Sequence, residues 1–144
     1  MTRIRILEVG QNPETLPTFA NTQGAWVRFA SQDVEGWAVF IYERTLSISD
    51  LEGRDFFVET SYENVQNIAR ANDTILERIE PLSREGNFLV QATIKNSDED
   101  GVIYCSAGEF NFMIKVPIGD RLKLMAGAKL SMEVYGLSLW DEHA

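Results

Sequence analysis

Residues 88–94 read Phe-Leu-Val-Gln-Ala-Thr-Ile and decide the fold class, because their apolar side chains alternate along the chain. Successive side chains of a β-strand point to opposite sides, so Phe88, Val90 and Ile94 share one face of an extended segment. The stretch 110–114, Phe-Asn-Phe-Met-Ile, repeats this pattern. Both stretches predict strands with one buried face.

Further strands are predicted on both sides of this pair. Short apolar or alternating stretches bounded by turn residues lie at 3–9, 25–30, 37–46, 54–59, 102–105 and 130–139. Many short strands separated by turns are typical of a sandwich or a barrel. The chain has 144 residues, 44% of them hydrophobic, which suits one domain, 1–144, with a sizeable core. We therefore predict a mainly β (β-rich α+β) fold, a small antiparallel barrel or sandwich.

One stretch has the period of a helix instead of a strand. Tyr62, Val65, Ile68 and Ala69 recur at spacings of three and four, and a serine that suits an N-cap precedes them. An asparagine and an aspartate offer a stop after the last of them. The pattern predicts one short amphipathic helix at 61–72.

The stretch 74–82 is compatible with two structures. Ile75 and Ile79 are four residues apart, which is the spacing of one helix face. The same stretch also suits an edge strand that ends at Pro81, because proline cannot donate a hydrogen bond to a neighbouring strand. The sequence leaves both structures open.

The run Phe88–Trp140 reads as strand, turn, strand, strand, connection and strand. This order resembles that of small Greek-key barrels of the oligonucleotide/oligosaccharide-binding (OB) type, and the resemblance implies an OB-like barrel. Such barrels often bind nucleic acid with stacked aromatic side chains in a positive groove. Phe110 and Phe112 would supply the aromatic rings, but the chain offers no positive groove.

The charge balance is strongly negative. The chain has 13 Lys and Arg against 22 Asp and Glu, a net charge of −9, and most of the excess lies in the first 100 residues. Nucleic acid is not expected as a partner, because binding it depends on Lys and Arg. An acidic surface can keep a protein soluble, steer it to a basic partner, or imitate a polyanion and so block a nucleic-acid-binding protein.

One acidic turn resembles the opening of a calcium-binding loop. In the stretch 96–101, oxygen-bearing side chains that include Asp98, Glu99 and Asp100 precede a glycine. The closing position of such a loop falls on Ala107, which has no carboxylate, and the flanks read as strands. A solvated hairpin turn is therefore favoured over a cation site. Asp98, Glu99 and Asp100 remain the candidate binding residues.

Catalytic groups are few. The only histidine, His143, lies in the C-terminal stretch, and Cys105 lies in an apolar stretch that suits a small buried side chain. One Cys and one His fall short of a zinc site. A carboxylate-based hydrolase with Trp26, Trp37 and Trp140 as cleft walls is an alternative, but Trp26 and Trp37 are expected in the core. We predict no enzyme activity, no cofactor and no metal.

Two acidic stretches that end in glycine, 33–36 and 98–101, each precede an apolar stretch. A duplicated β-unit would explain this echo. Two independent hairpins would also explain it and are favoured, because acidic residues followed by glycine are what a tight turn selects.

Size, charge and the shortage of catalytic groups predict a non-enzymatic, protein-binding domain. We expect an inhibitor- or immunity-type protein that occludes a basic partner; the alternative is a β-module that binds a small ligand or a divalent cation. A long exposed edge strand would also allow a homodimer.

No membrane contact is expected, because no stretch approaches the roughly 20 apolar residues of a membrane span. A signal peptide contains an uninterrupted apolar region, whereas Glu8 interrupts the first apolar stretch of this chain. The single Cys suits a reducing compartment. A cytoplasmic location is therefore expected.

Overall fold

The computed structural model describes residues 2–10, 18–19, 21–32, 34–83, 85–115 and 125–143. In these ranges the regular structure consists of strands and one 3-10 turn, η1 (Ile48–Asp50), so the prediction of a mainly β fold is confirmed. No helix within them is long and apolar enough to cross a membrane. The strands are β1 (Thr2–Val9), β2 (Thr18–Phe19), β3 (Thr22–Ser31), β4 (Val34–Glu43), β5 (Asp55–Ser61), β6 (Asn64–Arg70), β7 (Arg78–Pro81), β8 (Phe88–Ser97), β9 (Val102–Ala107), β10 (Phe110–Lys115), β11 (Lys129–Tyr135) and β12 (Ser138–Asp141).

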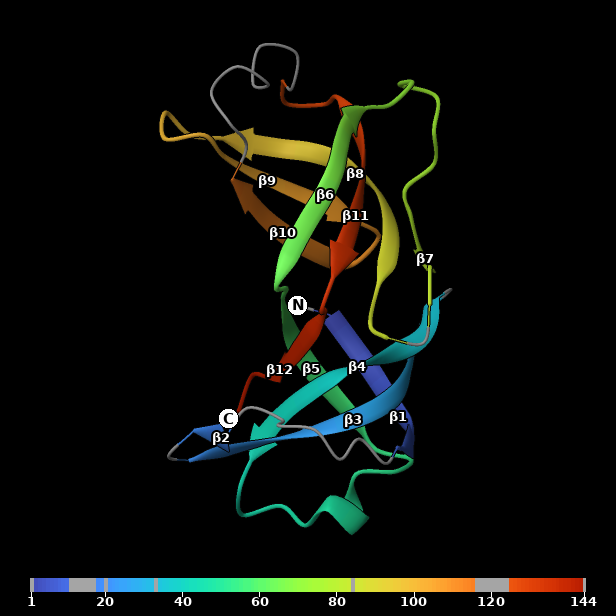
Figure 1. Ribbon diagram of the computed structural model, residues 1–144, viewed down its shortest axis with the longest axis vertical. Helices are drawn as coiled ribbons and strands as arrows, with labels where there is room; N and C mark the ends of the chain where they lie inside the picture. Colours follow the sequence, from blue (N-terminus) through green and yellow to red (C-terminus); the bar gives the residue numbers. More distant parts are fainter. Residues whose placement is uncertain are drawn as a thin grey trace.

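Five strands form a closed barrel, the lower part of Figure 1. Their order is β1-β5-β12-β4-β3, and β3 pairs back with β1, while the short β2 pairs with the first residues of β3 on the same edge as β1. All neighbours in the ring are antiparallel except β12 and β4, which run parallel. This is the Greek-key connectivity of an OB-type barrel. The predicted position of the OB-like barrel was the run Phe88–Trp140. This position was wrong, because only the last strand of that run, β12, belongs to the closed barrel.

The remaining strands form an open sheet that curls into a half-barrel, the upper part of Figure 1. Its order is β10-β9-β8-β11-β6, and β7 continues the line of β9 along the same edge of β8. Strand β7 ends at Pro81, so the edge-strand alternative for residues 74–82 was the correct one. The chain enters this sheet from β5 and leaves it into β12, so the whole sheet is inserted between two barrel strands.

One buried cluster runs through both sheets. Phe29 of β3 connects them, because its ring centroid lies 6.1 Å from that of Phe88 on β8 and 6.4 Å from that of Phe110 on β10. Gly36 of β4 lies against the Phe88 ring, which an added Cβ would approach to 2.7 Å. The barrel and the curled sheet therefore share a core.

The predicted last strand, residues 130–139, is in fact two strands in different sheets. Strand β11 belongs to the curled sheet and β12 to the barrel. Between them Gly136 has a φ of +67°, and an added Cβ would meet the side chain of Glu63 at 2.7 Å. This backbone conformation and the close approach both favour glycine, which lets the chain turn from one sheet into the other.

The predicted helix at 61–72 is absent, and strand β6 occupies its place. Between its pairs with Glu133 and Ser131 of β11, β6 contains one extra residue, a β-bulge in which Asn67 has a φ of +53°. A bulge shifts the alternation of side chains by one position. Val65 and Ile68 therefore both point toward the core although they are three residues apart. The spacing that predicted a helix is the spacing of a bulged strand.

The two acidic stretches that end in glycine occupy different places. Gly101 has a φ of +87° in the turn between β8 and β9, whereas Gly36 lies inside strand β4. Asp33, which opens the first stretch, lies outside the described residues. Two independent hairpins account for the echo without a duplication.

Candidate functional site

The acidic turn is organised by one of its own carboxylates. The Asp98 Oδ1 atom accepts hydrogen bonds from the backbone N–H groups of Asp100, at 2.9 Å, and Val102, at 3.0 Å. This is the Asx arrangement that commonly closes a turn. Asp98, Glu99 and Asp100 are exposed, and the described ranges contain no group of three or more ligands that could hold a metal ion. Ligand binding by these three residues stays a prediction.

The single cysteine is buried in this fold. Cys105 on β9 is 2% exposed, and burial raises the pKa of its thiol to about 12. Since the thiolate is the reactive form, this environment suppresses nucleophilic chemistry. His143 is exposed and follows β12, with its backbone N–H donating to the Asp141 carboxylate at 3.2 Å. The expectation that Cys105 is a small buried side chain is confirmed.

Trp26 and Trp37 are not core residues, contrary to the expectation. Both are half-buried on the outer face of β3 and β4, where their rings stack at a centroid distance of 5.9 Å and an interplanar angle of 17°. An added Cβ on Gly10 would meet the Trp37 ring at 2.6 Å, and one on Gly86 would meet the Trp26 ring at 3.3 Å. The pair thus holds two loops against the barrel. The sequence did not show which face of β4 is buried, because this strand carries apolar side chains on both faces.

Phe110 and Phe112 do not form an aromatic platform. Both are 4% exposed, because the inward side of β10 carries them. The outward side of the same strand carries Asn111 and Met113, and Met113 lies opposite Tyr104 of β9. The exposed groups of this hairpin are therefore different from those that the sequence indicated.

The edge of β10 faces the barrel and is held there by hydroxyl groups. The Thr2 hydroxyl donates to the Glu109 carbonyl at 2.7 Å, and the Tyr62 hydroxyl donates to the Met113 carbonyl at 2.6 Å. Between them, the Thr60 hydroxyl donates to the Asn111 carbonyl. Burial raises the pKa of Tyr62, which keeps its hydroxyl protonated as a donor. Alternate carbonyls of this edge, at 109, 111 and 113, are thus satisfied within the chain.

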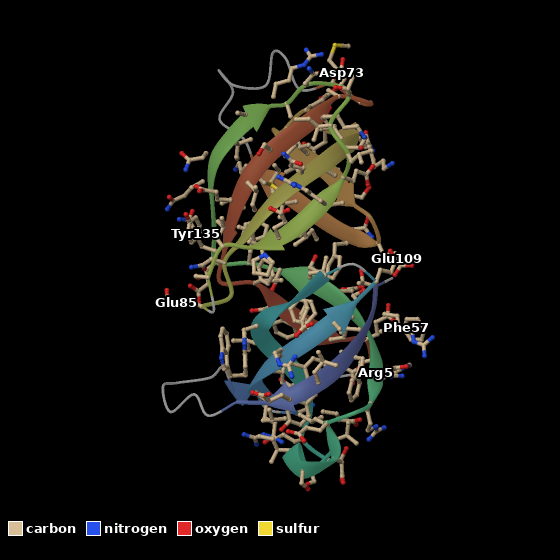
Figure 2. The ribbon with its side chains drawn as sticks, turned by 90° about the vertical axis from the view of Figure 1, so that its right-hand side faces the viewer. Arg5, Phe57, Asp73, Glu85, Glu109 and Tyr135 are labelled. Atoms are coloured by element: carbon tan, nitrogen blue, oxygen red, sulfur yellow. The ribbon has the colours of Figure 1, made fainter. Side chains whose placement is uncertain are left out.

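A hollow of about 410 Å³ lies at this seam between β10 and the barrel. Strands β1, β5, β8, β9 and β10 line it, and Tyr104 and Met113, which are 40% and 60% exposed, stand on its wall. Phe57 precedes the lining residue Val58 on β5 and is 47% exposed. Figure 2 shows Phe57 and Glu109 on one side of the molecule, with Glu85 and Tyr135 on the opposite side. Two exposed large apolar side chains, Tyr104 and Met113, therefore stand on the wall of one concavity.

A second hollow, of about 350 Å³, adjoins the first. Glu59 lines both hollows, and the second is otherwise formed by Trp140, Asp141, Glu142 and His143. Trp140 lies opposite Glu59 in the pairing of β12 with β5, and its indole N–H donates to the Ser61 hydroxyl at 2.9 Å. We call the two hollows together the seam groove.

The charges of the seam groove differ between its two ends. Lys95 lines the first hollow with Glu59, whereas the second hollow contains three carboxylates. In the described part of the chain, Glu59 and Glu142 form no ion pair. On the barrel strands β1 and β5, hydrogen bonds from Arg5 and Arg3 lower the pKa of Asp55 to about 2. The second hollow is therefore the acidic end of the groove.

The comparisons with known proteins assign nothing to this chain. No family model, curated protein or solved structure matches it. The site is thus defined by its geometry alone. Sequence reasoning missed Tyr104, Met113 and Glu59 because each belongs to a strand whose outward face could not be identified without the pairing.

Proposed function

We propose that this protein is a non-enzymatic binding domain that docks on a basic partner protein through the seam groove. The observation that supports this most directly is the position of two exposed apolar side chains, Tyr104 and Met113, on the wall of a concavity that Glu59 also lines. Within the described residues, the Glu59 carboxylate forms no ion pair. Exposed apolar patches rimmed by polar groups mark interaction sites on soluble proteins. A patch with this rim is suited to a protein surface that combines apolar and basic side chains.

The net charge of −9 favours the same kind of partner. Long-range attraction between a negative and a positive surface raises the rate of encounter and selects against acidic partners. Once docked, an acidic domain covers the basic surface it binds, so the binding domain acts as an inhibitor wherever that surface is functional. The occluding, immunity-type role is part of this proposal.

Binding of a small ligand is a second candidate, and the size of the first hollow favours it. Its volume of about 410 Å³ falls in the range of about 300–1,000 Å³ that small-molecule pockets occupy. A ligand that binds only the folded state raises the melting temperature. A thermal-shift screen of small metabolites and of calcium tests this candidate, and a specific shift that Met113→Asp removes would favour it.

Affinity capture from a lysate of the source organism at low and at high salt tests the proposed function. We expect a basic protein that wild-type bait retains at low salt and loses at high salt, because exposed charges are screened beyond about 8–10 Å at physiological ionic strength. The variant Glu59→Lys should lose the same protein, whereas Glu85→Lys, an equal charge change on the opposite side of the molecule, should retain it. Capture of no protein, or equal loss with both variants, would contradict the proposal.

A further inference from the structure

We propose that the seam groove recognises one segment of the partner by two side chains: an apolar side chain on Tyr104 and Met113, and an arginine or lysine beside Trp140 and Glu59. This inference rests on the proposed function and specifies how the partner is recognised. It follows from the order of the two hollows along β5.

The two ends of the groove are neighbours, because Glu59 lines both. The wall of the first hollow carries Tyr104 and Met113, which are directly paired across β9 and β10 and leave 40% and 60% of their surfaces exposed. Covering such side chains removes apolar surface from water at about 25 cal/mol per Å². This end of the groove therefore fits an aliphatic or aromatic side chain.

The second end has the composition of a site for a cation. The Trp140 ring is fixed by the hydrogen bond from its indole N–H to Ser61, and the carboxylates of Glu59 and Glu142 belong to the same hollow. A guanidinium or ammonium group is attracted both to the face of a tryptophan ring and to carboxylates. Asp141 is 7% exposed and accepts the backbone N–H of His143, so it fixes the chain that carries Glu142.

We expect the partner segment to be recognised by its side chains, because carbonyl groups of the adjacent edge are already occupied. Recognition by strand addition needs free backbone groups on an exposed edge. The carbonyls of Asn111 and Met113 on β10, and that of Glu109 just before it, already accept hydrogen bonds from the hydroxyl groups of Thr60, Tyr62 and Thr2. Affinity must then come from the apolar and cationic side chains, and this makes the sequence of the segment selective.

Selection of short random peptides displayed on phage against the wild-type chain tests the inference. We expect the enriched peptides to share an apolar residue and an Arg or Lys at a constant spacing. Synthetic versions should bind about tenfold more weakly to Tyr104→Ala and to Glu59→Lys, a loss typical of one strong interface contact. The matched controls, Leu76→Ala at an 82% exposed position and Glu85→Lys, should bind them as the wild type does.

The melting temperature of each variant shows that it is folded before binding is compared. Failure to enrich any peptide, enrichment of acidic peptides, or equal binding to the groove variants and their controls would overturn the inference. The proposed function fails separately: it falls if the capture experiment yields no salt-sensitive basic protein. A basic protein captured equally by wild type and Tyr104→Ala would keep the function and reject this mode of recognition.

Discussion

The barrel and the curled sheet are both built of β-strands, but the barrel is closed whereas the curled sheet has two open edges. In the barrel β3 pairs with β1, so each of its five strands has two neighbours. In the curled sheet β10 and β6 lie at the two ends of the strand order. An open edge is a template for unwanted pairing, and natural proteins protect it. The surface suited to binding lies where one of these edges meets the closed barrel.

The two edges of the curled sheet are protected in different ways. The edge of β10 is covered by hydroxyl groups from β1, β5 and the residue Tyr62. The edge strand β6 contains the bulge at Asn67, and bulges disrupt the regular register that a second strand needs. A homodimer stays a prediction, and these edges are not where a long regular strand would add.

The largest expected effect tests whether the two sheets unfold together. Phe29→Ala should lower the free energy of unfolding by about 3–5 kcal/mol, because a fully buried aromatic ring that contacts both sheets leaves a cavity. Chemical denaturation followed by circular dichroism and by tryptophan fluorescence should give one coincident transition in both proteins. Two separate transitions, with only one of them shifted, would show that the sheets are independent units.

A smaller effect is expected on the outer face of the barrel. Trp37→Ala should cost about 1–3 kcal/mol, because the half-buried ring loses its stack with Trp26 and part of its apolar contact. A tryptophan in the core would cost about 3–5 kcal/mol. Urea denaturation of the variant measures this loss of unfolding free energy. A loss in the range expected for a core tryptophan would contradict the half-buried position of Trp37.

The seam should respond weakly to loss of a single hydroxyl. Tyr62→Phe removes the bond to the Met113 carbonyl and should lower the free energy of unfolding by about 0.5–1.5 kcal/mol. Tyr104→Phe removes the hydroxyl of a 40% exposed tyrosine on β9 and serves as the control, with no change expected. Equal stability of the two variants would mean that the hydroxyl caps do not stabilise the seam.

The smallest effect concerns the barrel pair β1 and β5 and depends on pH. The folded-state pKa of Asp55 is about 2, below its ordinary value of 3.8, so its stabilising contribution is present above pH 3.8 and is lost as the pH falls through 2. The melting temperature of wild type should therefore exceed that of Asp55→Asn at pH 5, and the difference should shrink toward pH 2. A difference that stays constant over this range would contradict the role of the Arg5 and Arg3 hydrogen bonds.

Local pattern was sufficient to predict most strands but not their partners. Alternation of apolar residues identified β8 and β10, and the same rule failed at β6 because one bulged residue gives Val65 and Ile68 a helical spacing. The outward position of Trp37 depends on which face of β4 closes the barrel, which is a property of the whole ring. The hydroxyl caps join residues more than 50 positions apart, such as Tyr62 and Met113, and no local signal marks such a pair.

The central claim is that a basic partner docks at the seam groove. Amide hydrogen exchange of the chain, measured free and in complex with the captured partner, tests it most directly. The account predicts slower exchange on binding in residues 55–61 and 102–115, which carry Glu59, Tyr104 and Met113, and unchanged exchange in residues 22–43. Protection of residues 22–43, which carry the tryptophan pair, with no change at 55–61 and 102–115, would contradict it.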